Sequence, residues 1–419
     1  MDEDLDKFVE QYAAMLKSGQ DETIVEVHQA LGEVYFSGEK GRETFSKIAQ
    51  GLAAYQNGAF LKPLLSGALF MSESDDLDAK VSHYRACCLA VTILTSSEVV
   101  VKKFLMGTGR IEDKQTACLI YRNLTTNALI RAQALEKGQD SAAVLWVVLP
   151  LECLAKFIRG SRVFRDAMKD ISEERNIFET LGYFLSAEFL TKAGQENAAA
   201  IRGWLSEMAA SLAFSKDSQL WVLDMGLLKL MAAIYDSTQL QNLLDHMKQT
   251  DSPVFRCNAI LIRLLEKEAT LEKLRAHNAL AGFRPHKRKI NSADPQYRPW
   301  SYFEARLSGR PINMDQMRAE DPSWRPAYDV WELMHQPSRG NWAPAVCSWK
   351  LCTAGAEPEG DGKKYGKCAG CQVARYCSKE HQNLHWRTHK IHCQAGRAAI
   401  AGPEEEKQKE LRDPTSKAR

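Results

Sequence analysis

Apolar residues along most of the chain recur three and four positions apart. This spacing runs from about Asp21 to His277 and places the apolar side chains on one face of an α-helix. We find no segment with the strict alternation of apolar and polar residues that is typical of a half-buried β-strand. The pattern therefore predicts an all-α body over residues 1–280.

Two sequence phrases return along this body. The first reads aromatic, Arg, small residues and then a Leu/Ile/Val stripe, and it occurs as YRACCLAVTIL from Tyr84 and as FRCNAILIRLL from Phe255. The second reads as a helix end, a polar break, a short apolar helix and a Gly or charged turn. Its four copies begin at Leu94, Leu124, Phe157 and Leu212. Starts that lie 30, 33 and 55 residues apart give a loose period in the range of stacked helical repeats.

The stretch LAFSKDSQLWVLDMGLLKLM, residues 212–231, resembles an armadillo repeat, with Gly226 at the turn before its last helix. This resemblance implies an irregular armadillo-like solenoid. In a solenoid each helical unit covers only its neighbours, so the stack presents a concave groove that suits partner proteins. A helical domain without repeats is the alternative that the sequence leaves open.

The composition changes after His277. The stretch GFRPHKRKINSADPQYRPW introduces Pro, Gly and a basic cluster around Lys287, which is either a solvated run of charge or a nuclear address. Five tryptophans follow between Trp300 and Trp349, among many prolines. Because exposed aromatic rings are costly, we expect a Pro/Trp-rich connecting strap over residues 281–346 that packs on the helical body, with a short helix at YDVWELMH.

Cysteine and histidine are concentrated near the end of the sequence. Between Cys347 and Cys393 the potential ligands form four closely spaced pairs, which is enough for two tetrahedral sites. Thiolate and imidazole suit Zn²⁺, and four protein ligands leave no position for a substrate, so the sites should be structural. The segment has few apolar residues, so metal binding would supply its folding free energy. The predicted ligands are Cys347, Cys352, Cys368, Cys371, Cys377, His381, His389 and Cys393.

The same segment, residues 347–393, resembles the MYND-type zinc finger family through RYCSKEHQNLHWRTHKIHC. Three features depart from the family pattern. His381 stands where the family usually has Cys, and four residues rather than two separate Cys347 from Cys352. The gap from Cys352 to Cys368 is also long and Gly-rich. A charged tail is expected over residues 394–419. The positions that match the family pattern are Arg375, Tyr376, Cys377, Ser378, Gln382, Trp386, His389, Lys390 and Cys393.

The resemblance implies that the four ligand pairs interleave. One zinc ion would take the first and third pairs, and the other would take the second and fourth. The sequence agrees in part, because Cys377 and His381, and likewise His389 and Cys393, lie four residues apart and hence one helical turn apart. His385 and His392 are left over and are expected to face solvent, although His392 could compete with His389.

By the same resemblance, the finger would dock short proline-containing peptides of partner proteins, with Gln382 and Trp386 as contact residues. Packing of the Trp386 ring inside the finger is the alternative. Charge does not favour a nucleic-acid partner: residues 347–393 hold eight Lys/Arg and four Asp/Glu, and two Cys₃His zinc sites would lower this balance of +4 to about +2.

Other features of the sequence suit an intracellular protein of the cytoplasm, the nucleus or both. The start MDEDLDKF lacks a secretory pattern, and the longest apolar run, Ala142–Leu151, is shorter than the roughly 18 residues of a membrane span. Unpaired cysteines and metal thiolates both suit reducing conditions. We therefore expect neither membrane insertion nor disulfides.

The function expected from these features is that of a zinc-binding adaptor or regulator, with the finger and the helical body as two protein-binding surfaces. A MYND-type transcriptional regulator is the alternative. A lysine methyltransferase-related enzyme is the least favoured alternative, because its active site needs an Asn-His pair and a β-rich fold, whereas no Asn in this sequence is followed by His and the body reads as helical. We predict no enzymatic activity: no common catalytic motif occurs, and the histidines of the body stand singly, as surface or core residues do. These are His28, His83, His246 and His277.

Overall fold

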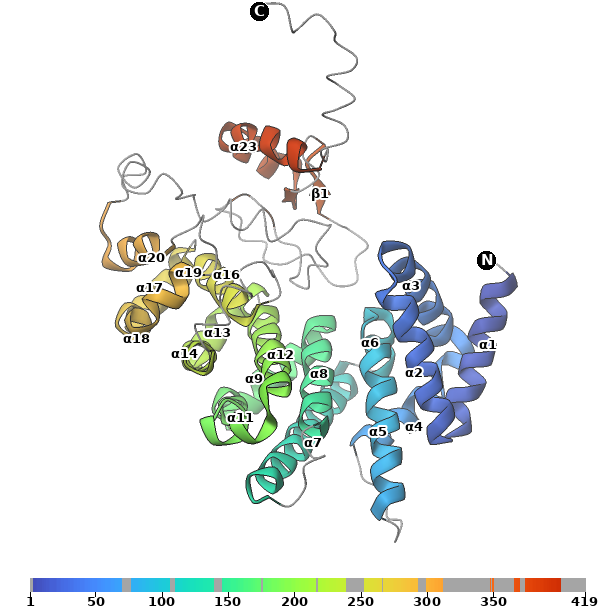
Figure 1. Cartoon of the computed structure of the whole chain (residues 1–419). Coiled ribbons are helices and arrows are strands. Elements are labelled where there is room, and N and C mark those ends of the chain that lie inside the picture. Colours follow the sequence, from blue (N-terminus) through green and yellow to red (C-terminus); the bar gives the residue numbers. More distant parts are fainter. Residues whose placement is uncertain are drawn as a thin grey trace, which may run out of the picture. The chain divides into compact units, whose positions relative to one another are not determined.

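In the residues that it describes, the computed structural model is built almost entirely of helices, with one short β-hairpin near the C-terminus (Figure 1). It divides into two units, residues 1–212 with 221–237, and residues 213–220 with 238–419. The described residues are 3–69, 77–105, 110–138, 145–174, 176–215, 218–238, 252–265, 267–292, 299–311, 347, 349, 365–369 and 374–400.

The first unit holds most of the described helices. Its elements are α1 (Glu3–Ser18), α2 (Asp21–Phe36), α3 (Glu39–Ala54), the 3₁₀ turn η1 (Tyr55–Gly58), α4 (Leu61–Leu69), α5 (Leu77–Leu94), α6 (Glu98–Leu105), α7 (Arg110–Glu136), α8 (Leu145–Gly160), α9 (Arg162–Glu174), α10 (Ile177–Tyr183), α11 (Ala187–Ala193), α12 (Gln195–Phe214) and α14 (Leu227–Ser237). Helix α13 (Gln219–Asp224) crosses the division between the units.

Apolar spacing explains how these helices bury one face. In α3 the buried residues Phe45, Ile48, Ala49 and Leu52 follow one another at intervals of three, one and three. Helix α14 repeats the same spacing from Leu227 to Ile234. Polar side chains fix some helix starts, as where the Asn176 side chain accepts hydrogen bonds from the backbone N–H groups of Phe178 and Glu179 at the start of α10.

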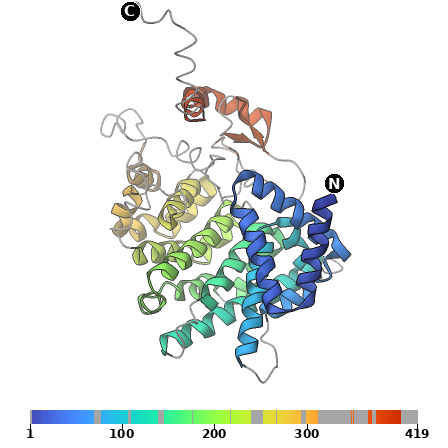
Figure 2. The same cartoon turned by 45° about the vertical axis from the view of Figure 1, so that its right-hand side comes forward.

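Neighbouring helices pack on one another through these faces. Helix α5 packs against both α2 and α8, while α4 covers α5 and α7 packs on α8 and α9 (Figures 1 and 2). The prediction of an all-α body is confirmed. The armadillo-like arrangement stays a prediction, because helix-on-helix packing of this kind suits more than one all-α architecture.

The recurring phrases mark helix ends in three of their four copies. Helix α5 ends at Leu94 before α6, α8 ends at Gly160 before α9, and α12 ends at Phe214 before α13. The predicted break after Leu124 is wrong, because α7 runs on unbroken to Glu136. No Gly or Pro lies between Leu124 and Glu136 to stop the helix, and the two threonines there cost only tenths of a kcal/mol each.

The second unit begins with short helices and ends with the finger. Its described elements are α16 (Pro253–Leu265), α17 (Glu268–Ala276), α18 (Ala279–Phe283), the 3₁₀ turn η4 (Arg284–His286), α19 (Lys287–Ser292), α20 (Pro299–Ser308), β1 (Gly366–Lys367), β2 (Arg375–Tyr376) and α23 (Lys379–Ile400).

Helices α19 and α20 occupy the first part of the predicted strap. Trp300 is buried there, with its ring centroid 5.3 Å from that of Phe303, as expected of a packing anchor. The basic cluster lies on η4 and α19, where Lys287 and Arg288 are exposed. The predicted helix YDVWELMH and Trp324, Trp331 and Trp342 lie outside the described residues, and the predicted domain boundaries stay predictions.

No helix in the described part of the chain is both long enough and apolar enough to cross a membrane.

Candidate metal centre

A hairpin and a capped helix place all the described candidate ligands of the finger except Cys347. Strands β1 and β2 pair antiparallel, with Gly366 opposite Tyr376, and a cysteine directly follows each strand: Cys368 after β1 and Cys377 after β2. The Ser378 hydroxyl then accepts a hydrogen bond from the backbone N–H of His381 (3.2 Å), which fixes the start of α23. Positions 381, 385, 389 and 393 follow at one helical turn each and so share one face of α23.

The first ligand group joins Cys347, Cys377 and His381. The Cys377 Sγ lies 2.9 Å from His381 Nδ1, and the Cys347 Sγ lies 3.7 Å from the same nitrogen. The three ligand atoms all lie within 4.8 Å of one another. Cys347 is buried, while Cys377 and His381 are half-buried. His381 therefore presents Nδ1 to the point where these three ligands converge.

The second group joins Cys368, His389 and Cys393. His389 Nε2 lies 3.3 Å from Cys368 Sγ, which in turn lies 3.8 Å from Cys393 Sγ. All three residues are buried, and their ligand atoms also lie within 4.8 Å of one another. The two sulfurs are much farther apart than the roughly 2.05 Å of a disulfide, so no disulfide joins Cys368 and Cys393.

Both groups have the spacing that a tetrahedral zinc ion needs. With Zn–S bonds of about 2.3 Å and Zn–N bonds of about 2.05 Å, two thiolates lie about 3.8 Å apart and a thiolate and an imidazole about 3.6 Å apart. The sulfur pair of the second group matches the first value at 3.8 Å. The sulfur to nitrogen distances of 3.3 and 3.7 Å lie close to the second value, while 2.9 Å for Cys377 and His381 is tighter. The donor set and its spacing therefore fit two zinc sites.

Six of the eight predicted ligands are thus brought together, three in each group, and they divide as the interleaved pairing predicts. Cys347 joins the pair at positions 377 and 381, while Cys368 joins the pair at 389 and 393. The remaining predicted ligands, Cys352 and Cys371, lie outside the described residues, so their place in each set stays a prediction.

The prediction that His385 faces solvent is wrong. His385 is only 4% exposed, and its Nδ1 lies 3.0 Å from the hydroxyl oxygen of Tyr376. It sits one helical turn from each of two ligands, His381 and His389, and so shares their inward face. The spacing of four residues could have revealed this, had His385 been placed on the helix rather than compared with the ligand pattern alone. The His392 side chain is not among those that the structure describes.

The two predicted peptide contacts lie at one edge of this inward face. The Trp386 ring is 46% exposed, with its centroid 5.9 Å from that of the ligand His389. Gln382 is half-buried and precedes Trp386 by one turn. Trp349 contacts the other group, since its ring centroid lies 4.3 Å from that of His381. Trp386 therefore packs partly on the finger and also leaves about half of its surface open.

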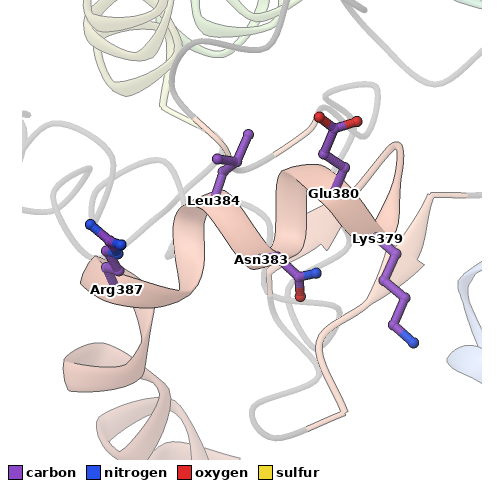
Figure 3. Close-up of a pocket in the computed structure, with 5 residues that line it drawn as sticks. All are labelled: Lys379, Glu380, Asn383, Leu384 and Arg387. Atoms are coloured by element: carbon purple, nitrogen blue, oxygen red, sulfur yellow. The ribbon is translucent and has the colours of Figure 1, made fainter.

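A different side of α23 carries a hollow of about 620 Å³. Leu384 is 51% exposed there, and charged residues flank it (Figure 3). Because Leu384 and Trp386 are two positions apart, their side chains point about 200° apart around the helix. The described lining residues are Lys379, Glu380, Asn383, Leu384 and Arg387.

A series of polar contacts in the helical body, which the sequence did not reveal, links Asp21, His83 and Cys87. Asp21 Oδ1 lies 2.7 Å from His83 Nδ1, and His83 Nε2 lies 3.5 Å from Cys87 Sγ. Such an order of groups can activate a thiol, but Cys87 is only 1% exposed and burial raises the pKa of its thiol to about 12. These contacts therefore tie α5 to α2 rather than present a nucleophile.

Comparison with known proteins agrees with the geometry of the C-terminal segment. Residues 347–393 match the family model of the MYND finger. No curated protein and no solved structure matches the chain. The matched range begins and ends at ligands of the two groups, Cys347 and Cys393. Residues 347–393 of this chain are therefore a MYND finger, a zinc-binding module of protein–protein interaction.

Proposed function

We propose that this chain is a zinc-dependent adaptor in which the MYND finger docks short proline-containing peptides and the helical body presents a second protein-binding surface. The observation that supports this most directly is the exposed edge of Trp386 beside the ligand face of α23. An indole that is partly held and partly open offers a rigid apolar surface at low entropic cost, which is how Trp acts at interfaces.

The proposal includes two zinc ions per chain with structural roles. The first ion is held by Cys347, Cys377 and His381, and Cys352 completes its set. The second is held by Cys368, His389 and Cys393, and Cys371 completes its set. In each case zinc fixes the hairpin to α23, so loss of the metal would also remove the peptide-binding edge.

The partner is proposed to be a protein rather than nucleic acid, and the role to be non-enzymatic and intracellular. Four-ligand zinc sites leave no coordination position for a substrate. The small positive balance of the finger gives few phosphate contacts. Exposed Lys287 and Arg288 on α19 are in keeping with a nuclear address.

Two single variants on α23 test the docking edge. An array of synthetic proline-containing peptides, each paired with a version in which Ala replaces Pro, is probed with the zinc-loaded chain. Trp386→Ala should weaken binding of the proline peptides at least tenfold, because it removes the exposed ring. Leu384→Ala is the matched control, since it removes a side chain of similar exposure on a different side of the same helix. Equal loss in both variants, or no preference for the proline peptides, would contradict the proposal.

A further inference from the structure

A layer of three aromatic rings lies against the second ligand group. The Tyr376 ring centroid lies 5.8 Å from that of His385 and 6.2 Å from that of His389, and the two histidine rings lie 5.4 Å apart. All three side chains are buried. His389 is a ligand and turns its Nε2 towards Cys368, whereas His385 and Tyr376 belong to neither ligand group in the described chain.

A hydrogen bond joins the two residues of this layer that are not ligands. The Tyr376 hydroxyl lies 3.0 Å from His385 Nδ1, and both residues are at most 4% exposed. A buried polar pair of this kind is costly unless its hydrogen bond is made, so it holds the two rings in one arrangement. Tyr376 comes from β2 and His385 from α23, so the bond also ties strand to helix.

Tyr376 and His385 lie where they can fix the orientation of the His389 ring. A zinc-binding imidazole must keep one ring nitrogen aimed at the metal, and outer contacts commonly fix that orientation. Here the His385 ring lies one turn before His389 on the same face of α23, and Tyr376 packs on both rings. Rotation of the His389 ring would have to displace this layer.

We propose that Tyr376 and His385 are positioning residues that hold the His389 imidazole with Nε2 towards Cys368 and Cys393, and so retain the second zinc ion. This inference rests on the proposed occupancy of both sites by zinc. Outer partners of metal ligands typically change metal affinity by about 10–100-fold. We expect a change of that size at the second site and little change at the first.

The test uses the full chain with zinc bound and measures release of each ion to a coloured chelator. Tyr376→Phe keeps the ring and removes only the hydroxyl, so the chain should fold while one of its two ions is released at least tenfold more readily. His385→Leu should do the same. His385→Asn can still offer a polar group near the place of Nδ1 and should recover part of the retention. Asn383→Ala, exposed on α23, is the control and should behave as the unaltered chain.

Cobalt substitution identifies which ion is affected. In a chain whose first group is disabled by Cys377→Ser, the visible cobalt spectrum reports the second site alone, and Tyr376→Phe should alter it. Unchanged release and an unchanged spectrum in both Tyr376→Phe and His385→Leu would overturn the positioning role. Equal weakening of both ions would also overturn it, since that indicates general packing. A chain that binds no zinc before any substitution would instead contradict the proposed metal occupancy.

Discussion

The helical body and the finger are stabilised by different kinds of core. In the body, rings pack on rings: the Phe157 centroid lies 5.3 Å from that of Phe164 and 5.9 Å from that of Phe104, and Phe157 is fully buried. In the described part of the finger, the buried cluster consists of Tyr365, Ala374, Tyr376 and three cysteines, with Trp349 packed against it. Fully burying an apolar side chain contributes about 1.5–3 kcal/mol, whereas a structural zinc site contributes about 10–16 kcal/mol of apparent binding free energy. Two metal sites could therefore supply the stability that the small apolar cluster of the described finger residues does not.

The same residue type serves opposite purposes in the two regions. Cys153 in α8 is fully buried, and burial raises the pKa of its thiol to about 12, so it remains a protonated, small apolar side chain. In the finger, cysteine sulfurs converge on histidine nitrogens instead. Burial alone therefore does not identify a metal ligand. The decisive signal is how many ligand atoms gather at one point.

Removal of zinc should produce the largest difference in stability between the finger and the helical body. Dialysis against a chelator should unfold residues 347–393, because each site contributes roughly 10–16 kcal/mol, while the far-UV circular dichroism of the body should change little. Elemental analysis before dialysis should give about two zinc atoms per chain. Collapse of the helical signal on chelation would mean that the body depends on the finger.

A cavity in the apolar core should have the converse effect. Phe157→Ala should destabilise the body by about 3–5 kcal/mol, because the side chain is fully buried between two other rings. Zinc content should stay at the unaltered value. Urea unfolding followed by circular dichroism measures the loss, and Leu384→Ala, at a 51% exposed site, is the control with almost no effect.

A substitution that disturbs the close packing between α4 and α5 should have a smaller effect on the stability of the body. A methyl group added at Gly67 would lie 2.4 Å from Cys87 Sγ and 3.1 Å from His83 Nε2. Gly67→Ala should therefore destabilise the body by about 1–3 kcal/mol through overpacking. Gly32→Ala in α2 meets nothing within 4 Å and should instead stabilise the body by about 0.5–1 kcal/mol, since alanine favours helix. Thermal melts of the two variants that shift in the same direction would contradict this packing.

The smallest effect concerns pH. Burial lowers the pKa of His28, despite the hydrogen bond between its Nδ1 and the Leu89 carbonyl. The folded state thus favours the neutral ring, so the unfolded chain binds more protons, and stability falls as pH drops below about 6.5 towards the folded pKa. His28→Gln should lose less stability than the unaltered chain between pH 7 and pH 5 in urea titrations. Acid release of zinc affects both chains alike, so the difference between them isolates His28.

Most of the correct predictions came from local periodicity in the sequence. Apolar spacing predicted the helices, and paired cysteines and histidines predicted the six described residues that gather at the two candidate metal sites. Their division into two groups followed from the resemblance to the MYND finger family. The burial of His385 could have been predicted from its spacing of four residues to His381 and His389, whereas the other misses involve contacts between distant positions or a stop signal that the sequence does not contain. Nothing local to His385 signals the Tyr376 hydroxyl, nothing near His83 signals Asp21, and the break expected after Leu124 assumed that two threonines end a helix. Such contacts exist only once the chain has packed.

The order of the ligands along the chain has a consequence for cleavage. Each ligand group takes its first cysteine, Cys347 or Cys368, from before residue 370 and its remaining described ligands from after residue 376. If both proposed zinc ions are bound, a protease that cuts between these points would leave two fragments that the ions still hold together. The two fragments should co-elute from a size-exclusion column and should separate once a chelator is added.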